Sequence, residues 1–560
     1  MRSPGHCAAP GTPARRQWRS RSGLVLRDAV PARLRRQWAE RGDCPDTGVY
    51  QAFAARVRAH GERIAVRTPE EALSYRELDA RARRMAAALR ALGAGPGDVV
   101  GIRLPGGWAA LAADLAVAAV GAVALPWPEG QGSRESHDLL ALSRARVLIT
   151  DAAAGAPAGG GPLPHLRHTV TVAELLRGDG DPADFAPADV DPEDPARFLV
   201  SSGSEAAPKL VAYSHNAMLG GRGTYVASVL GCGDGADSGV DDDGTAALVL
   251  VPPASSYGSL GLVALARCGA TLQLLGRFDP AAALRAVTEW RPTHLVAVPT
   301  MLLRLAAHPA RPGEDLSSLR SVVSSGAPLT SAALAAALER FGCPVTNVYG
   351  SSDGVNCRTT WTEPHDDVTR VGRPDPRVTE LRVCGPGDRP LPPGRSGEIQ
   401  ARGPMSPLCY AGAPDLDRRH RTADGWIRTG DLGVFDADGT LRVLDRIKQV
   451  VIRGGWTISP AEVEEHLHTH PHIAEAACVP VPDPELGERL CACLVQRPGT
   501  EPLDVADLAL HLTRARGLAR RKLPELVLHL DRLPLGPTGK ICRRTLAQAA
   551  AAEHLRAVPI

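Results

Sequence analysis

One pattern recurs through the middle of the chain: a short apolar run, a break at glycine or proline, and then a helix-forming stretch. Strands that alternate with helices in this way form parallel sheets covered by helices. The pattern therefore predicts an α/β fold with layered sheets and helices. The apolar runs lie at residues 247–253, 269–275, 294–298, 320–324 and 345–349.

The pattern changes after about residue 445. Short strands follow, with a helix expected over 460–468 and a strand over 474–480. At 560 residues the chain is also longer than one core usually holds. We therefore expect a second, smaller α+β domain. The expected boundaries are a large domain over 46–444, a hinge at 445–449 and a small domain over 450–560.

Residues 1–45 are expected to form a disordered extension. Arginines crowd the first part of this segment, no acidic residue precedes Asp28, and no apolar face repeats there.

Residues 108–127 are almost wholly apolar and have the length of a membrane span. Asp114 interrupts this run, and Gly121 and Pro126 suit a buried helix that leads into a strand. We therefore interpret the run as core and expect no membrane association.

Charge and cysteine content limit the partners of the chain. A formal net charge of +2 and an aromatic content of 4% do not favour a nucleic-acid partner. The twelve cysteines include no C-x-x-C pair, which favours reduced thiols. These features predict a cytoplasmic enzyme.

Lysine is rare, because the chain has only four lysines among its 64 lysine and arginine residues. A lysine carries a compact point charge on a slim stem, whereas arginine is a planar fork. Where this arginine-rich chain has a lysine, the position is therefore a candidate site at which a point charge must reach a single oxygen atom. Lys209 ends the segment SSGSEAAPK, and Lys540 ends the segment GPTGK.

The segment 198–209 predicts an apolar strand that leads into a loop of small residues. Backbone N–H groups and hydroxyls of such a loop can approach phosphate oxygens closely, with a lysine as counter-charge. The spacing differs from that of a Walker A loop. On its own, the segment is consistent with a phosphate loop or with a surface turn.

Several motifs taken together resemble the adenylate-forming superfamily, which includes acyl- and aryl-CoA ligases, peptide-synthetase adenylation domains and luciferases. The resemblance covers roughly residues 48–550, and the motifs follow the family's order. They are the loop 201–209, YGSSDG at 349–354, SGE at 396–398 with RGP at 402–404, WIRTGD at 426–431, DRIK at 445–448, RGG at 453–455 and PTGK at 537–540.

The resemblance implies a reaction in two steps that uses ATP and Mg²⁺. A carboxylate first attacks the α-phosphorus of ATP and gives an acyl-AMP and pyrophosphate. A thiol, from CoA or from the phosphopantetheine of a separate carrier protein, then displaces AMP. The small domain is expected to be mobile and to swing between the two steps, and the enzyme to be a monomer or a homodimer.

The same resemblance implies roles for individual residues. Lys540 would bridge the carboxylate and the phosphate oxygens, with His215 and the hinge residue Lys448 as further catalytic residues. Asp353 would hold Mg²⁺, and the thiol would pass by Gly454 and Gly455. The implied nucleotide-binding residues are Ser201, Ser202, Gly203, Ser204, Lys209, Ser325, Gly326, Ala327, Tyr349, Gly350, Ser351, Asp431 and Arg446.

The implied substrate pocket comprises Ser255, Ser256, Tyr257 and Gly258. Amino-acid-activating members carry an aspartate in this segment for the α-ammonium group, and residues 249–262 contain none. We therefore expect a small aryl or alicyclic carboxylic acid as substrate.

The chain departs from the family at Glu205 and Ala206, where threonine and glycine are usual, and at Asp353, which replaces glutamate. Two alternative functions therefore stay open. One is a diazotase-like relative that activates nitrite for an arylamine. The other is a catalytically degenerate homologue that only binds a nucleotide.

Overall fold

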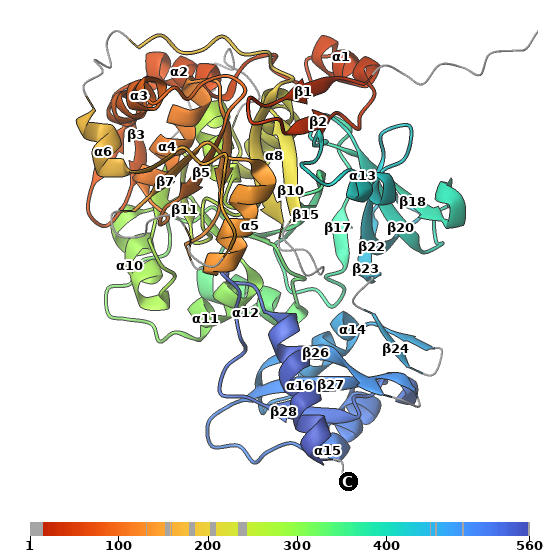
Figure 1. Ribbon diagram of the computed structural model, residues 1–560. Coiled ribbons are helices and arrows are strands. Elements are labelled where there is room, and N and C mark those ends of the chain that lie inside the picture. The colour runs from red at the N-terminus through yellow and green to blue at the C-terminus, as the bar shows by residue number, and fades with distance from the viewer. Residues whose placement is uncertain are drawn as a thin grey trace, which may run out of the picture.

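The computed structural model shows a large N-terminal domain and a smaller C-terminal domain, which lies below it in Figure 1. Sheets and helices alternate in layers in the large domain, and the fold is mixed α/β. The structure describes residues 15–129, 131–151, 157, 160–178, 185–201, 209–232, 244–447, 450–453, 456–483 and 486–557.

One sheet of the large domain has the strand order β16-β15-β14-β13-β11-β12-β3-β4. Its central strands, from β15 to β3, pair in parallel, which confirms the prediction from the repeated apolar runs. The strands are β3 (Ile64–Arg67), β4 (Ala72–Ser74), β11 (Ala246–Val249), β12 (Thr271–Leu274), β13 (His294–Ala297), β14 (Ser321–Ser325), β15 (Val345–Ser351) and β16 (Val355–Trp361). The helices between or beside them are α8 (Gly221–Leu230), α9 (Leu260–Val263), η1 (Ala264–Cys268), α10 (Pro280–Trp290), α11 (Pro299–Ala307) and α12 (Ser331–Phe341).

A second sheet has the strand order β21-β10-β9-β6-β5-β7-β8. One continuous apolar core joins the two sheets, with Ile102 from this sheet and Leu248 from the first. The strands are β5 (Val99–Arg103), β6 (Val123–Pro126), β7 (Val147–Thr150), β8 (His168–Thr171), β9 (Pro195–Ser201), β10 (Lys209–Ser214) and β21 (Cys409–Tyr410). The accompanying helices are α2 (Val49–His60), α3 (Tyr75–Ala91), α4 (Trp108–Ala119), α5 (Ser133–Ser143), α6 (Val172–Arg177) and α7 (His215–Leu219).

The apolar run at 108–127 forms the buried helix α4 and continues into β6. Asp114 is buried on this helix, and its Oδ2 lies 2.5 Å from Nη1 of Arg197 on β9. The core interpretation is therefore confirmed. In the part of the chain that the structure describes, no helix has both the length and the apolar character needed to cross a membrane.

A third sheet packs beside the first two and carries the SGE and WIRTGD motifs, with the strand order β17-β23-β22-β20-β18-β19. Its strands are β17 (Arg370–Gly372), β18 (Glu380–Gly385), β19 (Arg389–Pro390), β20 (Gly397–Arg402), β22 (Ile427–Phe435) and β23 (Leu441–Arg446), with η2 (Pro386–Asp388) and α13 (Pro414–His420) nearby.

The small domain has its own sheet and its own apolar core. The helix predicted over 460–468 and the strand predicted over 474–480 are both present, as α14 and β26. The elements are β24 (Val451–Arg453), β25 (Trp456–Ile458), α14 (Pro460–Leu467), β26 (Ile473–Asp483), β27 (Gly487–Gln496), α15 (Val505–Leu510), η3 (His511–Ala515), η4 (Arg520–Lys522), β28 (Leu526–His529) and α16 (Arg543–Ala557).

The prediction of disorder over residues 1–45 is wrong for residues 15–45. This segment forms β1 (Gln17–Arg19), β2 (Val25–Arg27) and α1 (Ala32–Glu40). Arg35 is buried there; its Nε donates to Asp28 at 3.0 Å and its Nη1 donates to the carbonyl of Ser406 at 2.8 Å. Anchoring of this segment thus depends on a buried arginine, which an apolar pattern does not reveal. Residues 1–14 lie outside the described residues.

Candidate active site

Lys540 reaches from the small domain to the large domain. A Cβ atom built on Gly326 would lie 2.9 Å from Cε of Lys540, so the lysine stem packs directly on this glycine. The preceding residue, Gly539, accepts a hydrogen bond from Oγ1 of Thr300 at 3.2 Å. The terminal PTGK motif therefore meets the carboxyl end of β14 and the start of α11.

The side chain of Lys540 is half-buried, and its ammonium group lies in a positively charged environment. Burial, together with the nearby guanidinium of Arg446, lowers the pKa of Lys540 to about 8. Two cations held this close repel each other, so an anion placed between them would be bound favourably.

Asp431 lies at the centre of a second set of contacts. Its Oδ2 accepts a hydrogen bond from the hydroxyl of Tyr349 at 2.7 Å, and its Oδ1 lies 2.9 Å from Nε of Arg446. The antiparallel register of β22 and β23 places Asp431 directly opposite Arg446. The structure thus brings Lys540, Arg446, Asp431 and Tyr349 together, although they come from four separate motifs.

The ends of β14 and β15 join this group. The hydroxyl of Ser325 donates to the carbonyl of Val348 at 2.9 Å, and the hydroxyl of Ser351 accepts from the N–H of Asp353 at 3.1 Å. Gly326 and Ala327 follow β14, while Gly350 belongs to β15. These residues therefore lie where the carboxyl ends of neighbouring parallel strands meet, the usual position of a ligand site in such sheets.

Asp353 accepts a hydrogen bond from the hydroxyl of Tyr410 at 2.6 Å, and Nζ of Lys209 lies 5.8 Å from the centre of the Tyr410 ring. Tyr410 thus contacts both Lys209, the lysine of the predicted phosphate loop, and Asp353, the expected metal ligand. Tyr410 could not be predicted from the motifs, because it belongs to a two-residue strand outside them. In the described residues, no group of three potential metal ligands gathers, so Asp353 would need oxygens from a ligand or from water to complete a magnesium site.

A strand pair brackets the predicted phosphate loop. Ser201, at the end of β9, pairs with Lys209, at the start of β10. Several predicted positions lie outside the described residues. They are Ser202, Gly203, Ser204, Glu205 and Ala206 of the loop, Lys448 of the hinge, and Gly454 and Gly455 of the expected thiol tunnel.

His215 is buried at the start of α7. Its ring Nδ1 accepts a hydrogen bond from the backbone N–H of Val49 at 3.1 Å, and the backbone N–H of His215 donates to the carbonyl of Asp194. Burial lowers the pKa of His215 to about 4, so the ring is neutral at pH 7. These contacts connect α7 to α2 and to the segment before β9, and a catalytic role for His215 stays a prediction.

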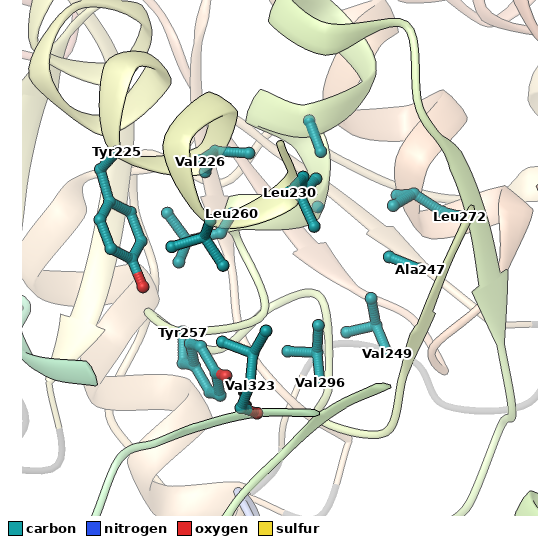
Figure 2. A pocket seen from close by; sticks show the side chains of 13 residues that line it. Tyr225, Val226, Leu230, Ala247, Val249, Tyr257, Leu260, Leu272, Val296 and Val323 are labelled. Carbon is teal, nitrogen blue, oxygen red and sulfur yellow. Dashed lines mark hydrogen bonds between the residues drawn. The ribbon is translucent and has the colours of Figure 1, made fainter. Parts of the chain in front are cut away.

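A cavity lies between α8, α9 and the strands β11–β14 (Figure 2). Of the four predicted pocket residues, Tyr257 lines it. Ser255 instead shapes the adjoining turn, because its hydroxyl donates to the carbonyl of Pro252 at 2.7 Å and accepts from the N–H of Gly258 at 2.9 Å. The carbonyl of Ser256 accepts from Arg222 at 3.2 Å.

One side of α8 also lines this cavity, which was not predicted from the sequence. Tyr225, Val226, Val229 and Leu230 all face it, at the spacing of one side of a helix. That periodicity was a usable signal, but it did not show that the helix covers a cavity instead of a closed core.

Two family models match the chain. The model described as AMP-binding enzyme matches residues 53–411, and the model described as AMP-binding enzyme C-terminal domain matches residues 462–540. Among curated proteins, a feruloyl-CoA synthase from Amycolatopsis sp. is 35% identical over 510 residues, which cover 89% of this chain and 97% of the relative.

Solved structures show the same similarity. The amide bond synthetase McbA from Marinactinospora thermotolerans has a TM-score of 0.77 at 29% identity and covers 90% of this chain and 99% of its own. The o-succinylbenzoate CoA synthetase MenE from Bacillus subtilis, solved with the acyl-adenylate intermediate OSB-AMP, has a TM-score of 0.77 at 26% identity, with coverage of 90% and 98%.

Proposed function

The chain belongs to the family of AMP-binding enzymes, and from this premise we propose that it is an AMP-forming acid–thiol ligase. It activates a small carboxylic acid as an acyl-AMP and passes the acyl group to a thiol. The observation that carries this proposal is the position of Lys540. This cation from the small domain packs on Gly326, which directly follows β14. Val323 of the same strand lines the apolar cavity, so β14 connects the lysine with the cavity.

In the first step, a carboxylate oxygen forms a bond with the α-phosphorus of ATP, and the bond from that phosphorus to the β-phosphate oxygen breaks. Both reactants are anions, so their approach needs positive charge at the reacting oxygens. Lys540 and Arg446 supply two such charges, and the burial of Lys540 strengthens its interaction with a bound anion.

The remaining residues would hold the nucleotide. Asp431 would accept hydrogen bonds from the ribose hydroxyls, Tyr349 would pack beside the adenine, and Lys209 would neutralise the terminal phosphates. A magnesium ion bound by Asp353 and phosphate oxygens would neutralise further charge.

The apolar cavity favours an aryl or alicyclic acid. The cavity walls consist of aliphatic and tyrosine side chains, with no charged side chain among them. A charged substituent would lose its hydration there without gaining a partner. The acyl acceptor is then the thiol of CoA or of a carrier protein's phosphopantetheine.

Exchange of labelled pyrophosphate into ATP tests this function directly. We expect exchange that depends on an acid from a panel of benzoic, cinnamic, alicyclic and fatty acids, with the cyclic acids preferred. Thioester formation with CoA and with a carrier protein would then identify the acceptor. Absence of exchange with every acid would contradict the proposed function.

The pKa of Lys540 predicts how adenylation depends on pH. The lysine acts as the protonated cation, and in the free enzyme its pKa is lowered to about 8. The value of kcat/KM should therefore fall as the pH rises through about 8, since it reports groups of the free enzyme. Bound ATP should raise the pKa of Lys540, so the decline of kcat should lie at higher pH. In a Lys540→Arg variant the side chain stays charged at all these pH values, so any remaining activity should not show this decline. A flat profile of kcat/KM for the wild-type enzyme up to high pH would contradict the assignment.

A further inference from the structure

The cavity of Figure 2 has a tyrosine end and an aliphatic end. Tyr225 and Tyr257 lie at one side, and Ala247, Val249 and Leu272 lie at the opposite side. The two tyrosine hydroxyls differ in one respect. The hydroxyl of Tyr257 donates to the carbonyl of Val323 at 3.0 Å, so its proton is already committed to the backbone.

The hydroxyl of Tyr225 is buried and has no hydrogen bond of good geometry with any described residue. The side chain of Asn356 is placed to donate toward its oxygen, and the charge of Arg358 lies near it, so it is the proton of the hydroxyl that lacks an acceptor. A buried donor without an acceptor costs free energy on the order of 1–3 kcal/mol. Such a group, on a residue that lines a cavity, points to a ligand that completes its hydrogen bonding.

The surroundings make Tyr225 a hydrogen-bond donor. Burial raises the pKa of its hydroxyl, so the group keeps its proton. Arg222, one helical turn earlier, is buried, and its Nη2 donates to Oγ of Ser259 at 2.6 Å. No carboxylate among the described residues forms an ion pair with Arg222, whose charge acts on the hydroxyl of Tyr225, so the surroundings of this hydroxyl favour an electron-rich oxygen.

The tyrosine end is also the end nearest the reacting carboxylate. Tyr257 is hydrogen-bonded to the carbonyl of Val323 on β14. Three residues after Val323 lies Gly326, which contacts Lys540. The side chain of Asn356 packs 3.4 Å from the position of a Cβ on Gly350, within the nucleotide motif. An acid whose carboxylate meets Lys540 would therefore place the atoms next to its carboxyl group beside Tyr225, and its far edge among the aliphatic side chains.

Resting on the proposed function, we infer that Tyr225 determines specificity by donating a hydrogen bond to an oxygen on the ring carbon next to the carboxyl-bearing carbon. The substrate class is thus an ortho-oxygenated aryl acid with a hydrocarbon far edge. In a 2-hydroxy acid the hydroxyl proton bonds the acid's own carboxylate, which leaves an oxygen lone pair free for Tyr225.

Pyrophosphate exchange with substituted benzoates tests this inference. In the wild-type enzyme, kcat/KM for 2-hydroxy- and 2-methoxybenzoate should exceed that for benzoate by about 10-fold to 100-fold, because benzoate leaves the donor unpaired. The 4-hydroxy isomer should be no better than benzoate, since its hydroxyl would enter the aliphatic end. In Tyr225→Phe, the ratio of 2-methoxybenzoate to benzoate should fall to about threefold or less.

Tyr257→Phe is the matched control, because it removes a hydroxyl that already has a backbone partner. It should lower kcat/KM for all the benzoates alike and leave their ratio unchanged. A second measurement needs no variant: 2-methylbenzoate has a shape similar to that of the 2-hydroxy acid but no acceptor, and it should react no better than benzoate.

The outcomes separate this inference from the function on which it rests. Exchange with benzoates but without a preference for a 2-oxygen, a preference that persists in Tyr225→Phe, or exchange with cinnamic or fatty acids alone would each overturn the inference and leave the ligase intact. Exchange with no acid at all would overturn both.

Discussion

Lys540→Ala should lower the rate of adenylate formation by about 10²-fold to 10³-fold, the range observed when one preorganised charge-stabilising group is removed. The substitution removes a half-buried cation from the point where, in the proposed function, a carboxylate approaches a phosphate. Pyrophosphate exchange measures the loss. ATP binding, followed by calorimetry, should persist, because Asp431, Tyr349 and Lys209 are unchanged.

The control for this variant is Lys522→Ala. Lys522 lies in the same small domain but outside the PTGK motif, and its Nζ is 2.6 Å from the carboxylate of Glu462. Its removal should leave exchange within about twofold, since partly exposed ion pairs contribute little. Thioester formation from pre-made acyl-AMP should also survive Lys540→Ala, because that step needs no new bond to phosphorus. Full exchange activity in Lys540→Ala would refute the assignment.

The positions of the strands around the site could be predicted because they follow from local patterns. Buried parallel strands are continuous apolar runs, and such runs marked β11 to β15 to within a few residues. Helix starts depend on short-range side-chain caps. Helix α3 begins at Tyr75, where Ser74 and Glu77 form a reciprocal cap.

The motif residues of the site were predictable, but their partners were not. Lys540, Asp431 and Arg446 stand in recognisable segments, and the fold brings them together. Tyr410 and Tyr225 stand in no motif, and their importance arises from contacts across long sequence separations. Arg35 is a similar case, because its buried contacts to Asp28 and Ser406 order a segment whose composition indicated disorder. Long-range polar contacts leave no periodic trace in a sequence.

A second large effect is expected from Arg197→Met, which should lower the free energy of unfolding of the large domain by about 3–5 kcal/mol. Arg197 is 3% exposed, and its Nη1 lies 2.5 Å from Oδ2 of Asp114, which is 6% exposed. Its Nη2 also donates to the carbonyl of Pro253 at 3.1 Å, beside the turn that adjoins the cavity of Figure 2. Urea unfolding followed by tryptophan fluorescence measures the change.

The double variant Asp114→Leu/Arg197→Met separates the charge from the packing. Without Arg197, the carboxylate of Asp114 stays buried and unpaired, which accounts for most of the expected loss. Removing both charges should restore most of the stability. Burial already raises the pKa of Asp114, and this shift should increase when Arg197 is absent. The single variant's deficit should therefore shrink as the pH falls and Asp114 takes up a proton, and grow as the pH rises. The loss of unfolding free energy could instead be equal in the single and double variants and independent of pH. That result would show that the packing of the arginine stem, and not its charge, stabilises the contact between α4 and β9.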